Sequence, residues 1–239
     1  RQLTYGELTG TMDEVGAQVE PRSLVFQLSK NTVGSVAGYL GFIEHDAVPV
    51  TLNAKIDQEL LGSLLNIYTP AYIWAPVEEA NRFDYEQVYE IYGYVLLKTK
   101  NERYPLNEEL QLCMTTSGST GSPKLVRYKK GNLEANAKNV ALAFGWTEAE
   151  RPVCDLGMQY TMGLNVINTH LYVGATVLLT TYNLMSGNFW EYIREKKATN
   201  FTGVPFSYDI FHRLHFERME LPDLRTLSQG GGKLTDAMF

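Results

Sequence analysis

The chain has 239 residues, of which 44% are hydrophobic and 20% are charged, and these fractions are ordinary for a globular protein with one sizeable core or two subdomains sharing one. The formal net charge of −6 argues against broad binding to nucleic acid, because attraction to phosphate backbones needs a basic face. No run reaches the roughly 18 uninterrupted apolar residues of a membrane-spanning helix, and the first residues lack the apolar region of a signal peptide. We therefore expect a cytoplasmic protein without a membrane span.

Strands and helices alternate in the first third of the chain. Short apolar runs predict buried strands at residues 24–28, 48–52 and 71–74. Apolar residues at helical spacing predict a helix over residues 32–44, and Asp57 is a good N-cap for a second helix over residues 58–67. The order strand, helix, strand, helix, strand is typical of a parallel sheet with right-handed crossovers.

Residues 78–109 are harder to interpret, because their tyrosines stand among charged residues. We interpret them as a surface connection that contains one short strand at residues 94–98, with the tyrosines half-buried at the surface. Apolar runs then predict strands at residues 110–115 and 125–128, on either side of a polar segment.

The second half continues the alternation. A helix is predicted over residues 132–144 and is closed by Gly145, with inward side chains at Leu133, Ala137, Val140, Ala141 and Phe144. Further strands are predicted at residues 153–157, 176–180 and 200–204. Further helices are predicted over residues 163–172 and from Ser186 or Asn188 to Lys197. The chain therefore alternates α and β structure from end to end.

The polar segment between two of these strands is the most informative stretch. It consists of Thr116, Ser117, Gly118, Ser119, Thr120, Gly121, Ser122, Pro123 and Lys124. Glycines let backbone N–H groups approach a polyphosphate, the hydroxyls add donors, and Lys124 adds a compact positive charge whose direction Pro123 restricts. It is not a Walker A motif, which needs Gly-Lys-Ser/Thr at the start of a helix. The pattern predicts a phosphate cradle, and a mobile Gly/Ser loop is the alternative.

The cysteines and histidines do not indicate a metal site. Cys113 and Cys154 lie in apolar, strand-like contexts, so we expect buried free thiols. The four histidines are scattered and match no ligand spacing, so no protein-bound metal site is predicted.

The signature T-S-G-S-T-G-x-P-K at residues 116–124 resembles the phosphate loop of the adenylate-forming (AMP-binding) superfamily. Acyl-CoA synthetases, peptide-synthetase adenylation domains and luciferases belong to this superfamily. Further segments agree with its motifs in the same order and extend over nearly the whole chain. They are L-T-Y-G-E-L at 3–8, A-V-P-V-T-L at 47–52, Gly163 with G-A-T-V at 174–177, G-V-P-F-S-Y at 203–208 and L-R-T-L-S-Q-G-G-G-K-L at 224–234.

This resemblance implies an α/β fold with two mostly parallel β-sheets and helices packed between and around them, as in the large N-terminal domain of these enzymes. By the same resemblance, one subdomain is expected at about residues 24–145, and a second at about residues 1–20 plus 151–239. The reaction implied is attack of a substrate carboxylate on the α-phosphate of ATP, with Mg²⁺ as the nucleotide's cation. The acyl-adenylate then passes its acyl group to a thiol, commonly that of coenzyme A.

The resemblance also assigns roles to particular residues. Thr116, Ser117, Ser119 and Thr120, with the backbone N–H groups of Gly118 and Gly121, would hold the β- and γ-phosphates, and Lys124 would offset their charge. The consecutive glycines Gly230, Gly231 and Gly232 would let the adenylate pass along the backbone, although a plain turn is an equal alternative. The pocket for the acid would be lined by Tyr160, Gly163, Val204, Pro205 and Tyr208.

Several positions depart from the family pattern. Tyr160 stands where the family usually has histidine, Leu125 where it generally has glycine, and Lys130 where it often has histidine. The family's later motifs and its small C-terminal domain, with the catalytic lysine, would follow residue 239. We therefore expect residues 1–239 to be a partial N-terminal domain without catalytic residues, which is inactive on its own within a larger ligase.

Two other functions are compatible with the same residues. The first is a catalytically silent domain that binds a small molecule or a partner on this scaffold. The second is a phosphotransferase that uses the glycine loop as a kinase would, which the absence of Gly-Lys-Ser/Thr disfavours.

Overall fold

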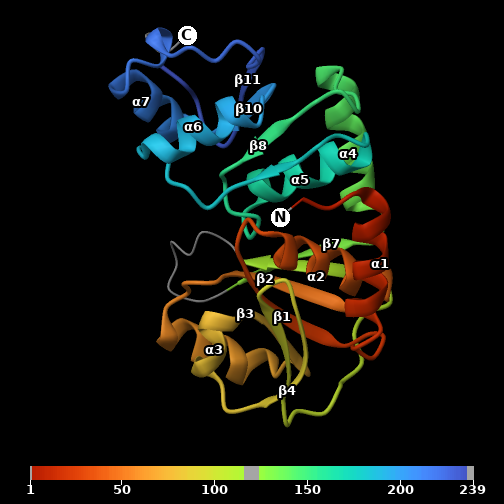
Figure 1. The fold of residues 1–239 in the computed structure, drawn as a ribbon. Helices are drawn as coiled ribbons and strands as arrows, with labels where there is room; N and C mark the ends of the chain where they lie inside the picture. Colours follow the sequence, from red (N-terminus) through yellow and green to blue (C-terminus); the bar gives the residue numbers. More distant parts are fainter. Residues whose placement is uncertain (1, 116–123, 236–239) are drawn as a thin grey trace. The chain divides into compact units, whose positions relative to one another are not determined.

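The computed structural model describes residues 2–115 and 124–235. The chain divides into two compact units, Arg1–Asn132 and Leu133–Phe239, each of which contains its own β-sheet (Figure 1). No helix within the described residues has both the length and the apolar character needed to cross a bilayer. The α/β fold with two sheets is the one predicted from the sequence.

The first unit is built on a seven-stranded sheet with the order β4-β5-β3-β1-β2-β6-β7. Strands β3, β1, β2 and β6 run parallel, while β5 pairs antiparallel to β3, β4 antiparallel to β5, and β7 antiparallel to β6. The strands are β1 Leu24–Ser29, β2 Val48–Asn53, β3 Tyr72–Pro76, β4 Glu86–Ile91, β5 Tyr94–Lys98, β6 Leu110–Thr115 and β7 Leu125–Lys129. The helices are α1 Tyr5–Gly16, α2 Val33–Glu44, α3 Gln58–Tyr68 and the 3-10 helix η1 Val77–Arg82.

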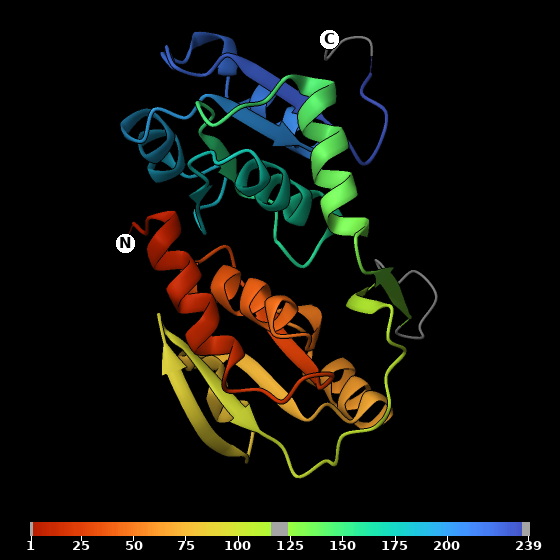
Figure 2. The same cartoon turned by 90° about the vertical axis from the view of Figure 1, so that its right-hand side faces the viewer.

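Helices cover both faces of this sheet because successive strand residues point to opposite sides. Phe26 and Leu28 of β1 pack in a cluster with Leu64 of α3, whereas the intervening Val25 packs in a second cluster with Phe42 of α2. Helix α1 lies beside α2 and adds to that second layer (Figure 2). The parallel core strands are therefore buried on both faces, which explains their nearly unbroken apolar sequences.

Local hydrogen bonds define where two of these helices begin. The Asp57 carboxylate accepts from the backbone N–H groups of Glu59 (2.9 Å) and Leu60 (3.0 Å), as expected of the predicted N-cap. Helix α1 was not predicted, although Thr4 and Glu7 form a capping box at its start. The Thr-x-x-Glu spacing that signals such a box is present in the sequence.

Strand β4 was also missed, because residues 78–109 were predicted to contain one strand only. Strands β4 and β5 form an antiparallel hairpin whose turn residues, Tyr92 and Gly93, both have positive φ angles of 48° and 72°. Two left-handed residues make the tight turn that suits the twist of a hairpin. Tyrosine is an uncommon first residue for such a turn, and β4 is largely exposed, so neither turn composition nor alternation indicated it.

The second unit is built on a four-stranded, entirely parallel sheet with the order β11-β10-β8-β9. We call it the small sheet. Its strands are β8 Pro152–Cys154, β9 Leu178–Leu179, β10 Asn200–Gly203 and β11 Thr226–Gln229. Its helices are α4 Asn132–Phe144, α5 Thr161–Tyr172, α6 Gly187–Glu195, α7 Pro205–Arg213 and the 3-10 helix η2 Phe216–Arg218.

The core of the second unit is rich in aromatic residues. Phe201 of β10 packs against Phe189 of α6 and Phe211 of α7, with ring centroids 6.4 and 4.9 Å apart. The predicted helix α4 has the expected bounds, but Phe144 was wrongly placed on its inner face. Its side chain is exposed and stacks on Trp146 beyond the end of the helix. Cys113 and Cys154 are buried free thiols, as predicted.

The two compact units differ in extent from the predicted subdomains. Residues 1–20 were grouped with residues 151–239, whereas in the structure α1 packs on α2 and buries Val15 in the first unit. Helix α4 was grouped with the first sheet, whereas contact clustering assigns residues from Leu133 onward to the second unit. The subdomain division of the complete enzyme stays a prediction.

The packing of α3 leads to a matched pair of stability predictions. Leu64→Ala should lower the free energy of unfolding of the first unit by about 2–5 kcal/mol, because Leu64 is fully buried and its removal leaves a cavity. Ile67→Ala on the same helix should change it by less than about 0.5 kcal/mol, because Ile67 is mostly exposed. Urea denaturation followed by circular dichroism measures both values. Equal losses for the two variants would contradict this packing.

Candidate active site

The predicted pocket residues come together at one edge of the small sheet. Because its four strands are parallel, their carboxyl ends all lie at the same edge, and the connections to the following segments start there. The connection after β8 leads to Tyr160 and Gly163, the one after β10 is Val204 and Pro205, and Gly230 follows β11. This is the edge at which ligands of open α/β sheets usually bind.

The three consecutive glycines pack directly against the other connections. A Cβ atom added to Gly230 would lie 2.5 Å from Cε of Met162 on α5, and one added to Gly231 would lie 3.3 Å from Cγ1 of Val204. Gly231 also has a φ angle of +81°, which favours glycine. The Gly230 N–H donates to the Gly203 carbonyl at 3.1 Å and so ties β11 to β10 beyond the end of the ladder. The space and conformation of this turn therefore require glycine.

A second close approach involves Gly163 in the first turn of α5. Any side chain there would collide with the carbonyl oxygens of Leu156 and Gly157. The Cys154 thiol lies 3.8 Å from the Gly163 carbonyl oxygen. Gly163 thus lets α5 pack tightly on the connection that leaves β8, so its role here is to position the connection.

The remaining predicted pocket residues differ in exposure. The Tyr208 hydroxyl donates to the Ser228 carbonyl at 2.7 Å, and burial raises the pKa of Tyr208 to about 12. Tyr208 therefore links α7 to β11 through this hydrogen bond. Tyr160 immediately precedes α5 and exposes 51% of its surface, while Val204 and Pro205 are half-buried at the start of α7. Pro205 stands at the first position of that helix, where its missing N–H costs nothing.

Asp155 is a further residue at this edge that the sequence analysis overlooked. It directly follows β8, at the same edge, and its Oδ1 atom is buried without a hydrogen-bond partner among the described residues. Burial raises the pKa of this carboxyl to about 6, although backbone hydrogen bonds from Asp155 and Leu156 act in the opposite direction. An aspartate placed just after an apolar strand of a parallel sheet was the available signal.

The phosphate loop belongs to the first unit. The two strands predicted beside it are present as β6 and β7, which pair antiparallel and end with Thr115 opposite Leu125. Lys124 precedes β7 and is exposed. The other predicted phosphate-binding residues lie outside the described residues: Thr116, Ser117, Gly118, Ser119, Thr120 and Gly121.

The glycine turn comprises the other residues predicted to lie beside the adenylate. Gly231 and Gly232 are exposed at the sheet edge, and the Gly232 carbonyl accepts a hydrogen bond from the Gln229 side chain. The tight contacts of Gly230 and Gly232 with Met162 and Pro205 show that the turn lies directly against the first turns of α5 and α7.

Comparison with known proteins identifies the family. The model of the AMP-binding enzyme family matches residues 1–239. The chain belongs to this family. An oxalate–CoA ligase of Arabidopsis thaliana is 33% identical over 133 residues, which are 54% of this chain and 26% of the ligase. A feruloyl-CoA synthase of an Amycolatopsis species is 29% identical over 127 residues, which are 52% of this chain and 26% of the synthase.

Solved structures share the fold at lower identity. The crystal structure of VinN superposes with a TM-score of 0.79 at 21% identity, over 98% of this chain and 63% of that one. The o-succinylbenzoate CoA synthetase of Bacillus subtilis, solved with an acyl-adenylate intermediate, has a TM-score of 0.78 at 20% identity. It is matched over 100% of this chain and 51% of its own. The fold is thus that of the N-terminal part of adenylate-forming enzymes, and this chain spans about half to two thirds of the two solved structures.

The environment of Asp155 predicts a pH-dependent stability difference. The folded-state pKa of about 6 lies above the ordinary value of 3.8, so ionisation of Asp155 destabilises the folded protein. This destabilisation grows as the pH rises between the two pKa values and is complete above about pH 7. Asp155→Asn should therefore gain stability relative to the wild type at pH 8, on the order of 1–3 kcal/mol, and keep only about half of this gain at pH 5.

Urea denaturation of both proteins at the two pH values measures this difference, and Asp223→Asn, at an exposed aspartate, serves as the matched control. A stability difference between Asp155→Asn and the wild type that stays constant from pH 5 to pH 8 would contradict the buried carboxylate.

Proposed function

We propose that the complete protein is an ATP-dependent, AMP-forming carboxylic acid ligase. The match of the AMP-binding enzyme family to the whole chain is the observation that carries this proposal. Membership in this family supports ATP as the nucleotide, with Mg²⁺ as its cation. The names of the two relatives, an oxalate–CoA ligase and a feruloyl-CoA synthase, support a carboxylic acid as substrate and coenzyme A as the acceptor thiol.

The proposed reaction has two steps. A carboxylate oxygen of the substrate attacks the α-phosphorus of ATP, and the bond to the bridging oxygen of pyrophosphate breaks, which leaves an acyl-adenylate. The thiol sulfur then attacks the acyl carbon, the carbon–oxygen bond to AMP breaks, and the thiol proton passes to solvent. A free carboxylate is a poor acyl donor, so attachment of AMP supplies a good leaving group.

In this proposal the residues of the chain act by positioning and charge neutralisation. The segment from Thr116 to Gly121 donates hydrogen bonds to the β- and γ-phosphates, and Lys124 offsets their charge. The turn of Gly230, Gly231 and Gly232 supplies backbone against which the adenylate lies. Tyr160, Gly163, Val204, Pro205 and Tyr208 shape the place of the acid, with Gly163 and Tyr208 acting through the packing described above.

The remaining catalytic groups of the ligase would come from segments outside residues 1–239, so we propose that this part alone is inactive. Carboxylate-dependent exchange of labelled pyrophosphate into ATP tests the proposal, with residues 1–239 and the complete protein assayed side by side. Exchange by the complete protein only is the expected result. Binding of an acid and ATP without exchange would instead identify a catalytically silent binding domain.

Loss of Lys124 should weaken nucleotide binding without unfolding the protein. One charge-assisted hydrogen bond contributes about 1.5–3 kcal/mol, so Lys124→Ala in the complete protein should raise the Kd for Mg-ATP roughly 10- to 150-fold. Isothermal titration calorimetry measures this change. Lys100→Ala removes another exposed lysine of the first unit and serves as the control. Unchanged ATP affinity in a folded Lys124→Ala protein would exclude the proposed role of this lysine.

A further inference from the structure

The connections at the carboxyl edge of the small sheet are almost free of charge. They comprise residues 155–162 after β8, 180–187 after β9, 203–207 at the end of β10 and 230–232 after β11. Asp155 is the single charged residue in these 24 positions. The overall charged fraction of 20% would place about five there. We call this surface the carboxyl-edge surface.

Large apolar side chains are exposed on the same surface. The exposed fractions are 51% for Tyr160, 65% for Phe206, 48% for Tyr182 and 62% for Met185. They belong to three connections, those after β8, β9 and β10, so the topology brings them together and they do not form a single apolar segment. Exposed apolar groups that converge on a ligand edge indicate an apolar ligand.

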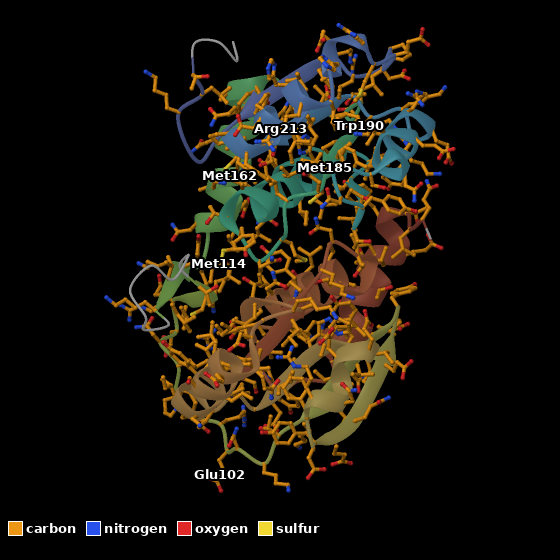
Figure 3. The ribbon with its side chains drawn as sticks, turned by 90° about the vertical axis from the view of Figure 1, so that its left-hand side faces the viewer. Glu102, Met114, Met162, Met185, Trp190 and Arg213 are labelled. Carbon is orange, nitrogen blue, oxygen red and sulfur yellow. The ribbon has the colours of Figure 1, made fainter. Side chains whose placement is uncertain are left out.

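The local geometry links this surface to the glycine turn. Met162 on α5 touches Gly230, and Pro205, which precedes Phe206, touches Gly232. The Met185 N–H donates to the Asn183 side chain at 2.8 Å, and Trp190 donates to the Leu184 carbonyl at 2.8 Å, so the connection after β9 is also held in place. Met162 and Met185 are labelled in Figure 3.

We propose that the acid activated by this protein is a monocarboxylic acid with an apolar, preferably aromatic, body that lies on the carboxyl-edge surface. This inference rests on the proposed ligase function and adds the substrate class to it. Tyr160 and Phe206 offer ring faces and edges for contact with an aromatic group. Removal of that group's apolar surface from water favours binding in proportion to the area covered.

A dicarboxylic acid fits this surface poorly. Contact of its second carboxylate with this apolar surface would displace water from the charge, and the four connections offer no cation in its place, which is costly. The one charge present, that of Asp155, would repel it. Lys233 is the cation nearest in sequence, and it is exposed and follows the third glycine. Lys233 is therefore the residue to test for contact with a second carboxylate.

A panel of acids tests the inference with the complete protein, Mg-ATP and coenzyme A, scored by release of AMP and pyrophosphate. Benzoic and 4-hydroxycinnamic acids represent the aromatic class, octanoic acid the aliphatic class, and oxalic and succinic acids the dicarboxylic class. We expect kcat/KM for the better aromatic acid to exceed that for either dicarboxylic acid at least 100-fold. Preference for a dicarboxylic acid, with loss of that activity in Lys233→Gln, would overturn the substrate class and leave the ligase function intact.

Variants on the carboxyl-edge surface provide the second arm of the test. Phe206→Ala and Tyr160→Ala should each lower kcat/KM for the aromatic acid at least 10-fold, chiefly through KM, while KM for ATP stays within twofold. Tyr172→Ala, which removes an exposed tyrosine from the opposite end of α5, is the matched control and should change neither value. Equal kinetics for all three variants would exclude this surface as the acid site. Failure of every acid to release AMP would overturn the ligase function and this inference together.

Discussion

The parallel pairing of β8, β10 and β11 is the constraint on which the candidate site depends. Parallel strands send their following connections to one edge, so three segments separated by up to about 75 residues meet there. The register places Gly203 opposite Gln229, and the glycine turn therefore begins where α7 begins. This strand pairing is what brings Val204 close to Gly231.

Small residues allow the connections that meet at this edge to pack closely. Gly163 lets the first turn of α5 rest on carbonyl oxygens of the connection after β8, and Gly230 lets Met162 reach the backbone of the turn. Tyr208 adds a hydrogen bond from α7 to the strand that precedes the glycines. These contacts connect the elements that contain the candidate site residues with the aromatic core around Phe201. The candidate site residues are therefore attached to rigid, well-packed elements.

The same convergence gives the surface its chemical character. Each connection alone is an unremarkable stretch of small, polar and apolar residues, but together they form an edge with four exposed large side chains and one carboxylate. The buried Oδ1 atom of Asp155 lacks a partner among the described residues, which is an exception of the kind that functional sites produce.

The sequence by itself determined the alternation of strands and helices, the N-cap at Asp57, the bounds of α4 and the glycine segments, because these depend on periodicity and on local hydrogen bonding. Family motifs, which are local strings, were likewise readable from sequence. Only the tertiary structure decided the order of the strands, the exposure of Phe144, the packing of α1 on α2 and the hairpin of β4 with β5. Burial of the Asp155 carboxylate and the union of four connections at one edge also required it, because both arise from contacts between segments that are distant along the chain.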